Sequence, residues 1–412
     1  MNEKARRLLI PDGVRDLLPG FAGPKREMEN RIQEVFGRWG YREVATPAFE
    51  YSAVFDGDAN GEQEGKVYRF LDERGRTMAL RPDFTSPLAR VAVTHLSNEP
   101  KPLRLCYGGN VYRHASGQQG RQREMAQAGV ELIGSGCAGS DAEIIALAVD
   151  VLRALKLDDF TLCLGHVGFL QAVLDAHGVT GIAGERINHF FNRKDFVSLK
   201  ELSSELQLPA FSRESILRLP TLRGGREVLA EADVLLPPGT DRGSLATLDE
   251  IWQVLEDYGV SRFITFDLGL VRALDYYTGM VFEGYTGGLG FPLCGGGRYD
   301  RLLGHFGQNS PAVGFAINTD HLLLVQQRLK KLPPSPALLF AAYNEKARAE
   351  AIARAQELRD SGLAVIIDTK ARASGEARDE AGQRGASLLL YFDESGCSQT
   401  DLAGEASSDV CQ

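Results

Sequence analysis

The sequence lacks the features that mark secreted, membrane-spanning and zinc-binding proteins. Its six cysteines among 412 residues include no Cys-x-x-Cys pair and none with a histidine at zinc-finger spacing. We therefore expect free thiols in a reducing compartment and no metal site. The first residues contain no long apolar run, which argues against a secretory signal, and no stretch of about 18 apolar residues could cross a bilayer. These absences predict a soluble, cytoplasmic protein without membrane contact.

Common catalytic and nucleotide-binding signatures are also missing. The sequence contains no Gly-x-Ser-x-Gly, His-Glu-x-x-His or EF-hand pattern. Its glycine-rich segment CGGGRYD, residues 294–300, lacks the Gly-Lys-Ser/Thr of a P-loop and the strand–glycine–helix setting of a dinucleotide site. A net charge of -9 provides no general basic surface for nucleic acid. We expect no resident cofactor.

The length of the chain implies more than one domain, because 412 residues exceed an ordinary single core. Residues 1–325 are predicted to form a large domain, with a helical insertion at about 168–260. A proline-rich linker, 326–335, follows. Alternating strand and helix patterns over 336–392 predict a small α/β module with a parallel sheet. The polar residues 393–412 are expected to form an acidic tail.

Two long apolar runs predict the centre of the large domain. Leu103 to Arg113 and Met125 to Ile133 have the pattern of two antiparallel strands joined by a polar, glycine-rich loop. Amphipathic helices are predicted before them, from Pro24 to Trp39, and after them, from Ser140 to Leu155. The predicted fold class is α+β, an antiparallel sheet flanked by helices.

The first candidate site lies on these two strands. Arg113, Arg121 and Arg123 flank the loop and could bind a carboxylate or a polyphosphate, although they could equally be solvated arginines on an exposed hairpin. Gln127 and Glu131 occupy alternate positions of one apolar strand and therefore face the same side. They form either a ligand site or a satisfied structural network.

The second candidate site lies in the C-terminal third of the large domain. Arg272 and Tyr276 fall on one face of a strand-forming run, with Tyr277 on the other face if the strand is regular, and an aromatic core strand is the alternative. The glycines of 294–300 favour close backbone approach to a ligand or a neighbouring strand. His321, in a predicted helix, is by itself more typical of a structural residue.

Taken in order, these segments resemble histidyl-tRNA synthetase over nearly the whole chain. GVRDLLP and YREVATPAFEY resemble the opening segment and class II motif 1, and YRHASGQQGRQREMAQAGVELIG resembles motif 2. RALDYYTGMVFEGY and CGGGRYD resemble the two signatures peculiar to histidyl enzymes, and PAVGFAINTDHLL resembles motif 3. The resemblance implies the class II synthetase fold.

The resemblance also implies a histidine pocket. Its predicted residues are Asp83, Thr85, Arg113, Gln127, Glu131, Arg272, Tyr276 and Tyr277. In the family, the residues matching Glu131 and Tyr277 hold the imidazole, those matching Asp83, Thr85 and Gln127 suit the ammonium group, and that matching Arg272 faces the carboxylate. Phe84 replaces a glycine of the family's pattern, and we expect it to narrow the site.

Three departures from the family concern ATP. The motif 2 acid that holds adenine is Ala115 here, the stacking aromatic residue is Met125, and the motif 3 arginine is His321. The last unit is short and acidic, with eight lysines and arginines against thirteen aspartates and glutamates from Ser335 onward. RNA-reading surfaces are usually basic, so tRNA binding is not expected.

Retained amino-acid recognition with lost activation matches one synthetase-like group, the regulatory subunits of short-form ATP phosphoribosyltransferase. That group implies no catalytic residues in this chain, a separate catalytic subunit as partner, L-histidine as ligand for feedback, and a homodimer core within a hetero-oligomer. Two alternatives are an active synthetase with unusual motifs and a stand-alone histidine sensor or RNA-regulatory paralogue.

Overall fold

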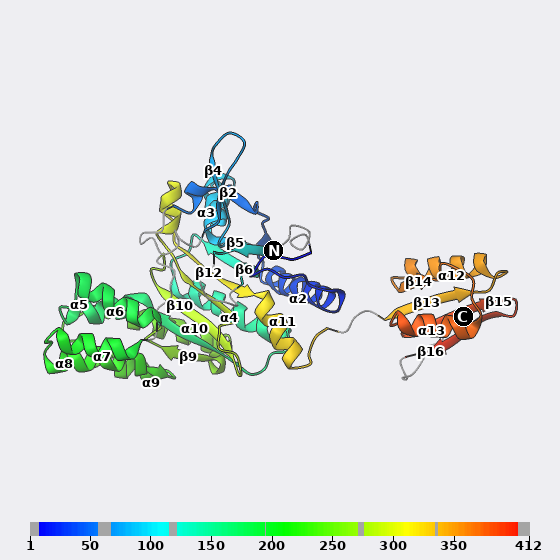
Figure 1. Ribbon diagram of the computed structural model, residues 1–412. Coiled ribbons are helices and arrows are strands. Elements are labelled where there is room, and N and C mark those ends of the chain that lie inside the picture. Colours follow the sequence, from blue (N-terminus) through cyan, green and yellow to red (C-terminus); the bar gives the residue numbers. More distant parts are fainter. Residues whose placement is uncertain are drawn as a thin grey trace. The chain divides into compact units, whose positions relative to one another are not determined.

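The computed structural model describes residues 8–56, 67–114, 122–193, 195–270, 276–333 and 337–402. Two compact units make up the chain, one over Met1–Pro333 and the other over Pro334–Gln412. The first contains a large sheet covered by helices, and the second is a small α/β module (Figure 1). Within the described ranges no helix is both long and apolar enough to cross a bilayer.

The large sheet has nine strands in the order β1-β5-β6-β12-β11-β10-β7-β9-β8. Their bounds are β1 Arg42–Glu43, β5 Leu103–Tyr112, β6 Glu124–Ile133, β7 Phe160–His166, β8 Arg223–Gly224, β9 Ile264–Asp267, β10 Met280–Thr286, β11 Cys294–Arg298 and β12 Ala312–Asn318. Each neighbouring pair from β5 through β6, β12, β11 and β10 to β7 is antiparallel, as predicted. The outer strands β1 and β9 pair in parallel with β5 and β7, so the whole sheet is mixed.

Strand β6 shows how the sheet separates its core from its site. Val130 and Leu132 lie in the main hydrophobic core, against Ile32 of α2 (Pro19–Arg38) and the apolar face of α4 (Ala138–Ala154). Because side chains alternate along a strand, Gln127 and Glu131 face the opposite side. Helix α2 begins five residues earlier than predicted, with a proline at its first position.

A smaller apolar cluster covers part of that opposite side. Helix α3 (Thr85–Thr94) and the 3-10 helix η5 (Leu302–Phe306) contribute Leu88 and Leu303, which pack with Leu105 of β5. A three-stranded sheet, β2 (Phe49–Tyr51), β4 (Thr77–Leu80) and β3 (Arg69–Leu71), lies beside α3 (Figure 1). The pattern of residues 41–49 predicts one strand, and this prediction is wrong, because the run is divided between β1 and β2 on either side of Pro47.

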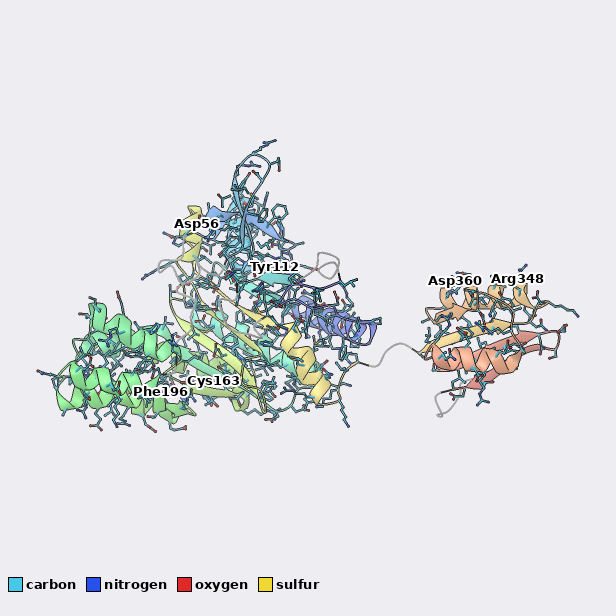
Figure 2. All side chains as sticks on the ribbon, viewed as in Figure 1. Asp56, Tyr112, Cys163, Phe196, Arg348 and Asp360 are labelled. Carbon is cyan, nitrogen blue, oxygen red and sulfur yellow. The ribbon has the colours of Figure 1, made fainter. Side chains whose placement is uncertain are left out.

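Six α-helices occupy residues 167–257, between β7 and β9. Their bounds are α5 Val167–Ala176, α6 Gly181–Arg193, α7 Phe196–Glu205, α8 Ala210–Arg218, α9 Glu227–Asp233 and α10 Gly243–Asp257. Figure 2 labels Phe196 at the start of α7 and Cys163 on β7. Short 3-10 helices η1 (Ser52–Val54), η3 (Leu219–Thr221) and η4 (Ser261–Phe263) complete the connections. Helix α11 (Thr319–Arg328) ends the unit.

The second unit is a three-layer module. Its sheet has the order β14-β13-β15-β16, in which β13 (Leu338–Tyr343) pairs in parallel with both β14 (Ala364–Ile367) and β15 (Leu388–Asp393). Helix α12 (Arg348–Asp360, its ends labelled in Figure 2) packs on one face of the sheet and α13 (Ser374–Gln383) on the other. Each face therefore has a core of its own.

Our prediction of a tail from residue 393 onward is wrong for its first part. Strand β16 (Gly396–Asp401) forms a tight antiparallel hairpin with β15 and contributes partly buried Cys397 to the module's core. The polar composition of the segment hid this strand, because an edge strand does not need an alternating apolar face. Residues 403–412 lie outside the described part of the chain.

We expect a chain that ends at Pro333 to fold by itself, because the first unit has a complete hydrophobic core. Thermal unfolding should remain cooperative, with a midpoint close to that of this unit in the full chain. A control that ends at Asn318 removes α11 and its buried Leu322, Leu323 and Val325, each contributing about 2 kcal/mol. Calorimetry of both truncations would contradict the expectation if the longer one unfolded without a cooperative transition.

Candidate functional site

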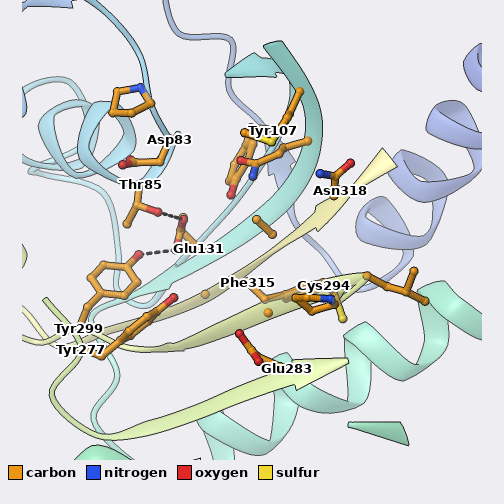
Figure 3. A pocket seen from close by; sticks show the side chains of 18 of the residues that line it. Asp83, Thr85, Tyr107, Glu131, Tyr277, Glu283, Cys294, Tyr299, Phe315 and Asn318 are labelled. Carbon is orange, nitrogen blue, oxygen red and sulfur yellow. Dashed lines mark hydrogen bonds between the residues drawn. The ribbon is translucent and has the colours of Figure 1, made fainter. Parts of the chain in front are cut away.

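A cavity of about 350 Å³ opens on the side of the large sheet that carries Glu131. Strands β6, β12 and β11 and the start of α3 contribute its walls (Figure 3). Seven of the eight residues predicted to bind histidine line it, namely Asp83, Thr85, Arg113, Gln127, Glu131, Tyr276 and Tyr277. The eighth, Arg272, lies outside the described residues, as do Ala115 and Arg121. The fold thus gathers segments separated by nearly the whole length of the large unit.

Four further residues of the cavity were missed by sequence reasoning: Tyr107, Glu283, Tyr299 and Asn318. Tyr299 lies within the segment 294–300, two residues after Gly297, and the glycines are the stronger signal of that segment. Tyr107 on β5 and Glu283 on β10 share their strands with apolar residues that face the core. A strict alternation reading of β5 and β10 could have placed both on the site side of the sheet.

Glu131 is the most deeply buried carboxyl group of the cavity, with 2% of its surface exposed. The Thr85 hydroxyl donates a hydrogen bond to Oε1 over 3.0 Å, and the Tyr299 hydroxyl donates to Oε2 (Figure 3). Burial raises the pKa of Glu131 to about 8, although both hydroxyl donors act to lower it. At neutral pH the empty site therefore holds this side chain mostly as the neutral acid.

Glycines in the neighbouring strands make room for these side chains. A Cβ atom at Gly314 of β12 would lie 1.8 Å from Oε2 of Glu131, and one at Gly129 of β6 would lie 2.4 Å from the Tyr107 hydroxyl. Neither position could carry any other residue without moving the site. The glycine-rich character of this sheet is therefore a requirement of the cavity.

Asp83 lies beside the start of α3, where its position is fixed by the backbone. Its Oδ1 accepts a hydrogen bond of 3.2 Å from the Ser86 N–H, and Arg113 binds the Pro82 carbonyl oxygen through Nε over 2.8 Å. Burial raises the pKa of Asp83, while the Ser86 N–H and the charge of Arg113 oppose the rise. Phe84 does not narrow the cavity as expected: it is buried behind the wall and stacks on Tyr107 at 4.3 Å.

Tyr276 and Tyr277 precede β10 instead of lying within a strand, and both line the cavity. The prediction of opposite faces required a regular strand and therefore does not apply here, because the alternation rule holds only for extended strands. Their rings lie 4.9 Å apart, and that of Tyr276 meets the ring of Tyr299 edge to face at 5.8 Å. Together with Tyr107, they give the Glu131 end of the cavity four tyrosines.

The other end of the cavity holds the residues that depart from the synthetase pattern. Met125 and His321 line it beside Pro292. The His321 ring donates from Nδ1 to the Pro292 carbonyl oxygen over 3.0 Å and packs on Phe291, with ring centroids 4.0 Å apart. Asn318 accepts the His321 N–H at the start of α11. His321 thus ties α11 to the loop before β11, across the region where the resemblance places ATP.

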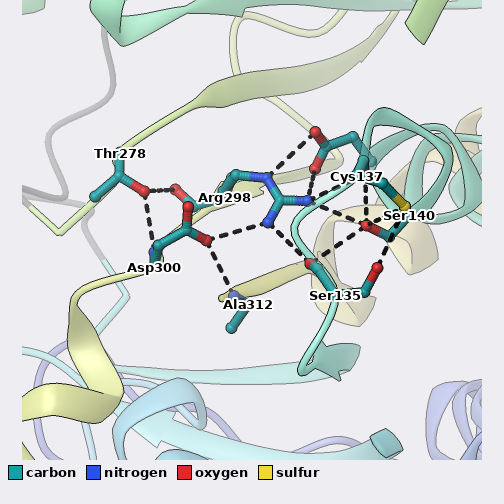
Figure 4. A network of polar contacts seen from close by, with 8 residues as sticks. Ser135, Cys137, Ser140, Thr278, Arg298, Asp300 and Ala312 are labelled. Atoms are coloured by element: carbon teal, nitrogen blue, oxygen red, sulfur yellow. Dashed lines mark hydrogen bonds and ion pairs between the residues drawn. The ribbon is translucent and has the colours of Figure 1, made fainter. Parts of the chain in front are cut away.

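A buried ionic network supports the strand that leads to Tyr299 (Figure 4). Arg298 pairs with Asp141 of α4 over 2.6 Å and with Asp300 over 3.1 Å. The same guanidinium donates to the Ser135 carbonyl oxygen after β6, over 3.0 Å. It therefore joins three segments around Tyr299. The described residues contain no group of acids, histidines and cysteines suited to a metal ion.

The chain is similar to known proteins over most of its length. The sequence model for histidyl-tRNA synthetase matches residues 13–322. An ATP phosphoribosyltransferase regulatory subunit from Moorella thermoacetica is 43% identical over 92% of this chain and 97% of its own. Another, from Desulforamulus reducens, is 41% identical over 95% of this chain and 97% of its own.

Solved structures show the same similarity. A Bacillus halodurans protein described as an ATP phosphoribosyltransferase regulatory subunit/histidyl-tRNA synthetase superimposes with a TM-score of 0.84 at 34% identity, covering 93% of this chain and 97% of its own. Histidyl-tRNA synthetase from a Nostoc species gives a TM-score of 0.83 at 22% identity, over 96% and 95% of the two chains. The latter supports the fold alone.

Replacing Glu131 by glutamine should stabilise the ligand-free protein increasingly as pH rises. The folded protein keeps Glu131 protonated up to about pH 8, whereas the unfolded chain ionises it above about 4.5. Between about pH 4.5 and pH 8, the free energy of unfolding of the natural protein should thus fall by up to roughly 1.4 kcal/mol per pH unit. The Glu131→Gln variant should not show this fall, because its amide does not ionise. Urea unfolding at pH 5, 6.5 and 8 measures this, with exposed Glu27→Gln as control for net charge. A Glu131→Gln effect independent of pH would contradict it.

Proposed function

Since the chain belongs to the histidyl-tRNA synthetase family and, within it, to the ATP phosphoribosyltransferase regulatory subunits, we propose that it binds histidine and regulates a separate catalytic subunit. In this proposal the chain carries no catalytic residues of its own and does not aminoacylate tRNA. The observation that carries the proposal is the cavity around Glu131, which is lined by seven of the eight residues that we assign to histidine. Met125 and His321, at positions that we assign to the nucleotide, line it too and differ from the family pattern.

The cavity has the chemistry that a histidine side chain requires. An imidazole ring presents N–H donors, and Glu131 is a buried acceptor placed among tyrosine rings. A carboxyl oxygen can accept more than one hydrogen bond, so a ligand that supplies an N–H gains a contact that an apolar amino acid cannot make. In our assignment Glu131 and Tyr277 contact the ring.

Other polar groups of the cavity suit the amino-acid backbone. Asp83 and Gln127 are placed in the cavity wall where they can accept from an α-ammonium group. Thr85 is also predicted to contact the ammonium group. In the empty site its hydroxyl donates a hydrogen bond to Glu131, so in our proposal Thr85 positions the carboxyl that meets the imidazole ring. Arg113 and Arg272 are assigned to the carboxylate, since arginine offers a bidentate match to it.

The names of the relatives imply a catalytic ATP phosphoribosyltransferase subunit as partner, and we propose that this subunit is of the short form. We also propose a homodimer core, with a second copy of this chain on the small sheet. Phe49, Tyr51 and Phe70 on β2 and β3 leave 51%, 47% and 42% of their surfaces exposed, and clustered exposed aromatic residues favour protein contacts. No disulfide joins any two of the five cysteines among the described residues, and we propose a reducing, cytoplasmic setting for the chain.

The protein should not catalyse histidine-dependent exchange of pyrophosphate into ATP. Each lost nucleotide contact, at Ala115, Met125 and His321, removes about 1–3 kcal/mol of binding. His321 and the loop at Pro292 also meet across that end of the cavity. A complete histidyl-tRNA synthetase, assayed alongside, shows that the conditions support exchange. Exchange by this chain at a comparable rate would identify it as an active synthetase with unusual motifs.

Histidine should bind the isolated chain, and Glu131→Gln should weaken binding by about 1.5–3 kcal/mol, the range for a hydrogen bond to a charged group. Titration calorimetry measures this, with Arg272→Ala as a second test and His321→Ala, at the far end of the cavity, as a control expected to have little effect. In the complex with the catalytic subunit, histidine should inhibit the Glu131→Gln form only at concentrations about tenfold to a hundredfold higher. The reason is that a ligand shifts an equilibrium only through its differential affinity for two states. Unchanged inhibition in both site variants would show that feedback acts elsewhere.

A further inference from the structure

We propose that the cavity takes histidine with its imidazole ring protonated, and that the proton is supplied by the Glu131 carboxyl group. This inference rests on the proposed histidine site and specifies the chemical form of its ligand. In the binding step the O–H bond of Glu131 breaks and an N–H bond forms on the ring nitrogen that faces it. The product is an imidazolium–carboxylate pair, and no proton enters from or leaves to solvent at neutral pH.

The first observation is that no described cation contacts Glu131. From β5 it meets Leu105 across the strand pair and the Tyr107 ring, and from β12 it meets Gly314, which has no side chain. The hydroxyl groups of Thr85 and Tyr299 occupy its two oxygens. Each oxygen of the carboxyl thus has one hydroxyl partner, and no opposite charge lies beside it in the described part of the site.

The other ionisable groups near Glu131 do not place a positive charge beside its carboxyl group either. Asp83 is a second buried acid, whose negative charge disfavours ionisation of Glu131. Arg113 directs its Nε to the Pro82 carbonyl oxygen and acts on Asp83. Tyr276 and Tyr277 are phenols with no positive charge to offer. An acid in such surroundings keeps its proton, which agrees with the pKa of about 8 for Glu131.

A bound imidazole ring would face an acid whose pKa is higher than the pKa of the free ring. Free imidazole has a pKa of about 6.5, so without any interaction the proton would prefer Glu131, at about 8, by roughly 30-fold. Opposite charges about 4 Å apart attract each other by roughly a thousandfold at the effective dielectric constant of such sites. That attraction exceeds this difference in proton affinity. Burial of the ring opposes its protonation, and the pairing with Glu131, the neighbouring aromatic rings and a second N–H donor favour it.

The walls of the cavity also favour a cation. The rings of Tyr276, Tyr277 and Tyr299 lie together at the Glu131 end, with centroids 4.9 and 5.8 Å apart for the two neighbouring pairs. Aromatic faces attract cations, and their attraction grows when water is excluded. A protonated ring also presents two N–H donors, one for Glu131 and one for a tyrosine oxygen, whereas a neutral ring presents one.

Calorimetry of histidine binding in buffers with different ionisation heats counts the protons exchanged. At pH 7.2 we expect close to none, and at pH 5.5, where the free ring is already charged, we expect release of about one proton. Release of about one proton at pH 7.2 would mean that a neutral ring binds ionised Glu131, and would overturn the inference. Failure of histidine to bind at every pH would contradict the proposed function instead.

Nuclear magnetic resonance of ¹⁵N-labelled histidine in the complex shows where the proton lies. Two ring nitrogens with similar chemical shifts at pH 7.2 are the expected result, because both carry hydrogen in imidazolium. Widely separated shifts would show that the proton stayed on Glu131 and would overturn the inference. This measurement uses the unaltered protein and does not depend on a variant that folds.

Glu131→Gln provides the matched control, because an amide cannot transfer a proton to the imidazole ring. Its bound ring should be neutral, with widely separated nitrogen shifts. Above pH 8 the affinity of the natural protein should fall by about tenfold per pH unit relative to the variant, because binding then needs a proton from solvent. The amino group of histidine also titrates in this pH range, but it affects both proteins equally. The ratio of the affinity of the natural protein to that of the variant is therefore free of this effect. A constant ratio between pH 7 and 9 would contradict the proposal.

Discussion

Much of this molecule depends on the burial of one carboxyl group, Glu131, without a described cation beside it. Holding it there requires two hydroxyl donors from distant segments, Thr85 at the start of α3 and Tyr299 after β11. It also requires Gly314 in the adjacent strand, where any side chain would collide with the carboxyl. The site is therefore distributed over the whole large unit, and α3, β6, β11 and β12 must be assembled before it exists.

The two ends of the cavity have separate physical supports. Around Glu131, the Arg298–Asp141 ion pair anchors the segment that carries Tyr299 to α4 and so to the main core. At the other end, His321 links α11 to the loop at Pro292 through a hydrogen bond and a ring contact. A protein can therefore keep amino-acid recognition at one end while it replaces nucleotide contacts at the other. In our proposal, this division separates a regulatory member of the family from a synthetase.

The fold could be predicted from the sequence where hydrophobic patterns were long. The antiparallel pair β5–β6, the helices α2 and α4 and the parallel pairing of β13 with its neighbours follow from periodicity over ten or more residues or from strand–helix alternation. Short or polar elements could not be predicted. Strand β16 has no apolar alternation, and Pro47 divides one apparent strand between two sheets. In both cases tertiary pairing, not local preference, decides the structure.

The sequence by itself determined which residue types stand at the positions that we assign to histidine and to the nucleotide, because motif positions are read directly from the chain. It also placed Gln127 and Glu131 on one face, since a strand alternates strictly. Only the tertiary structure decided that Tyr299 and Thr85 occupy both oxygens of Glu131, that Tyr276 and Tyr277 line the same cavity, and that His321 closes the far end. Those contacts join residues tens to nearly two hundred positions apart, and the burial that sets the ionisation of Glu131 exists only when all of them have come together.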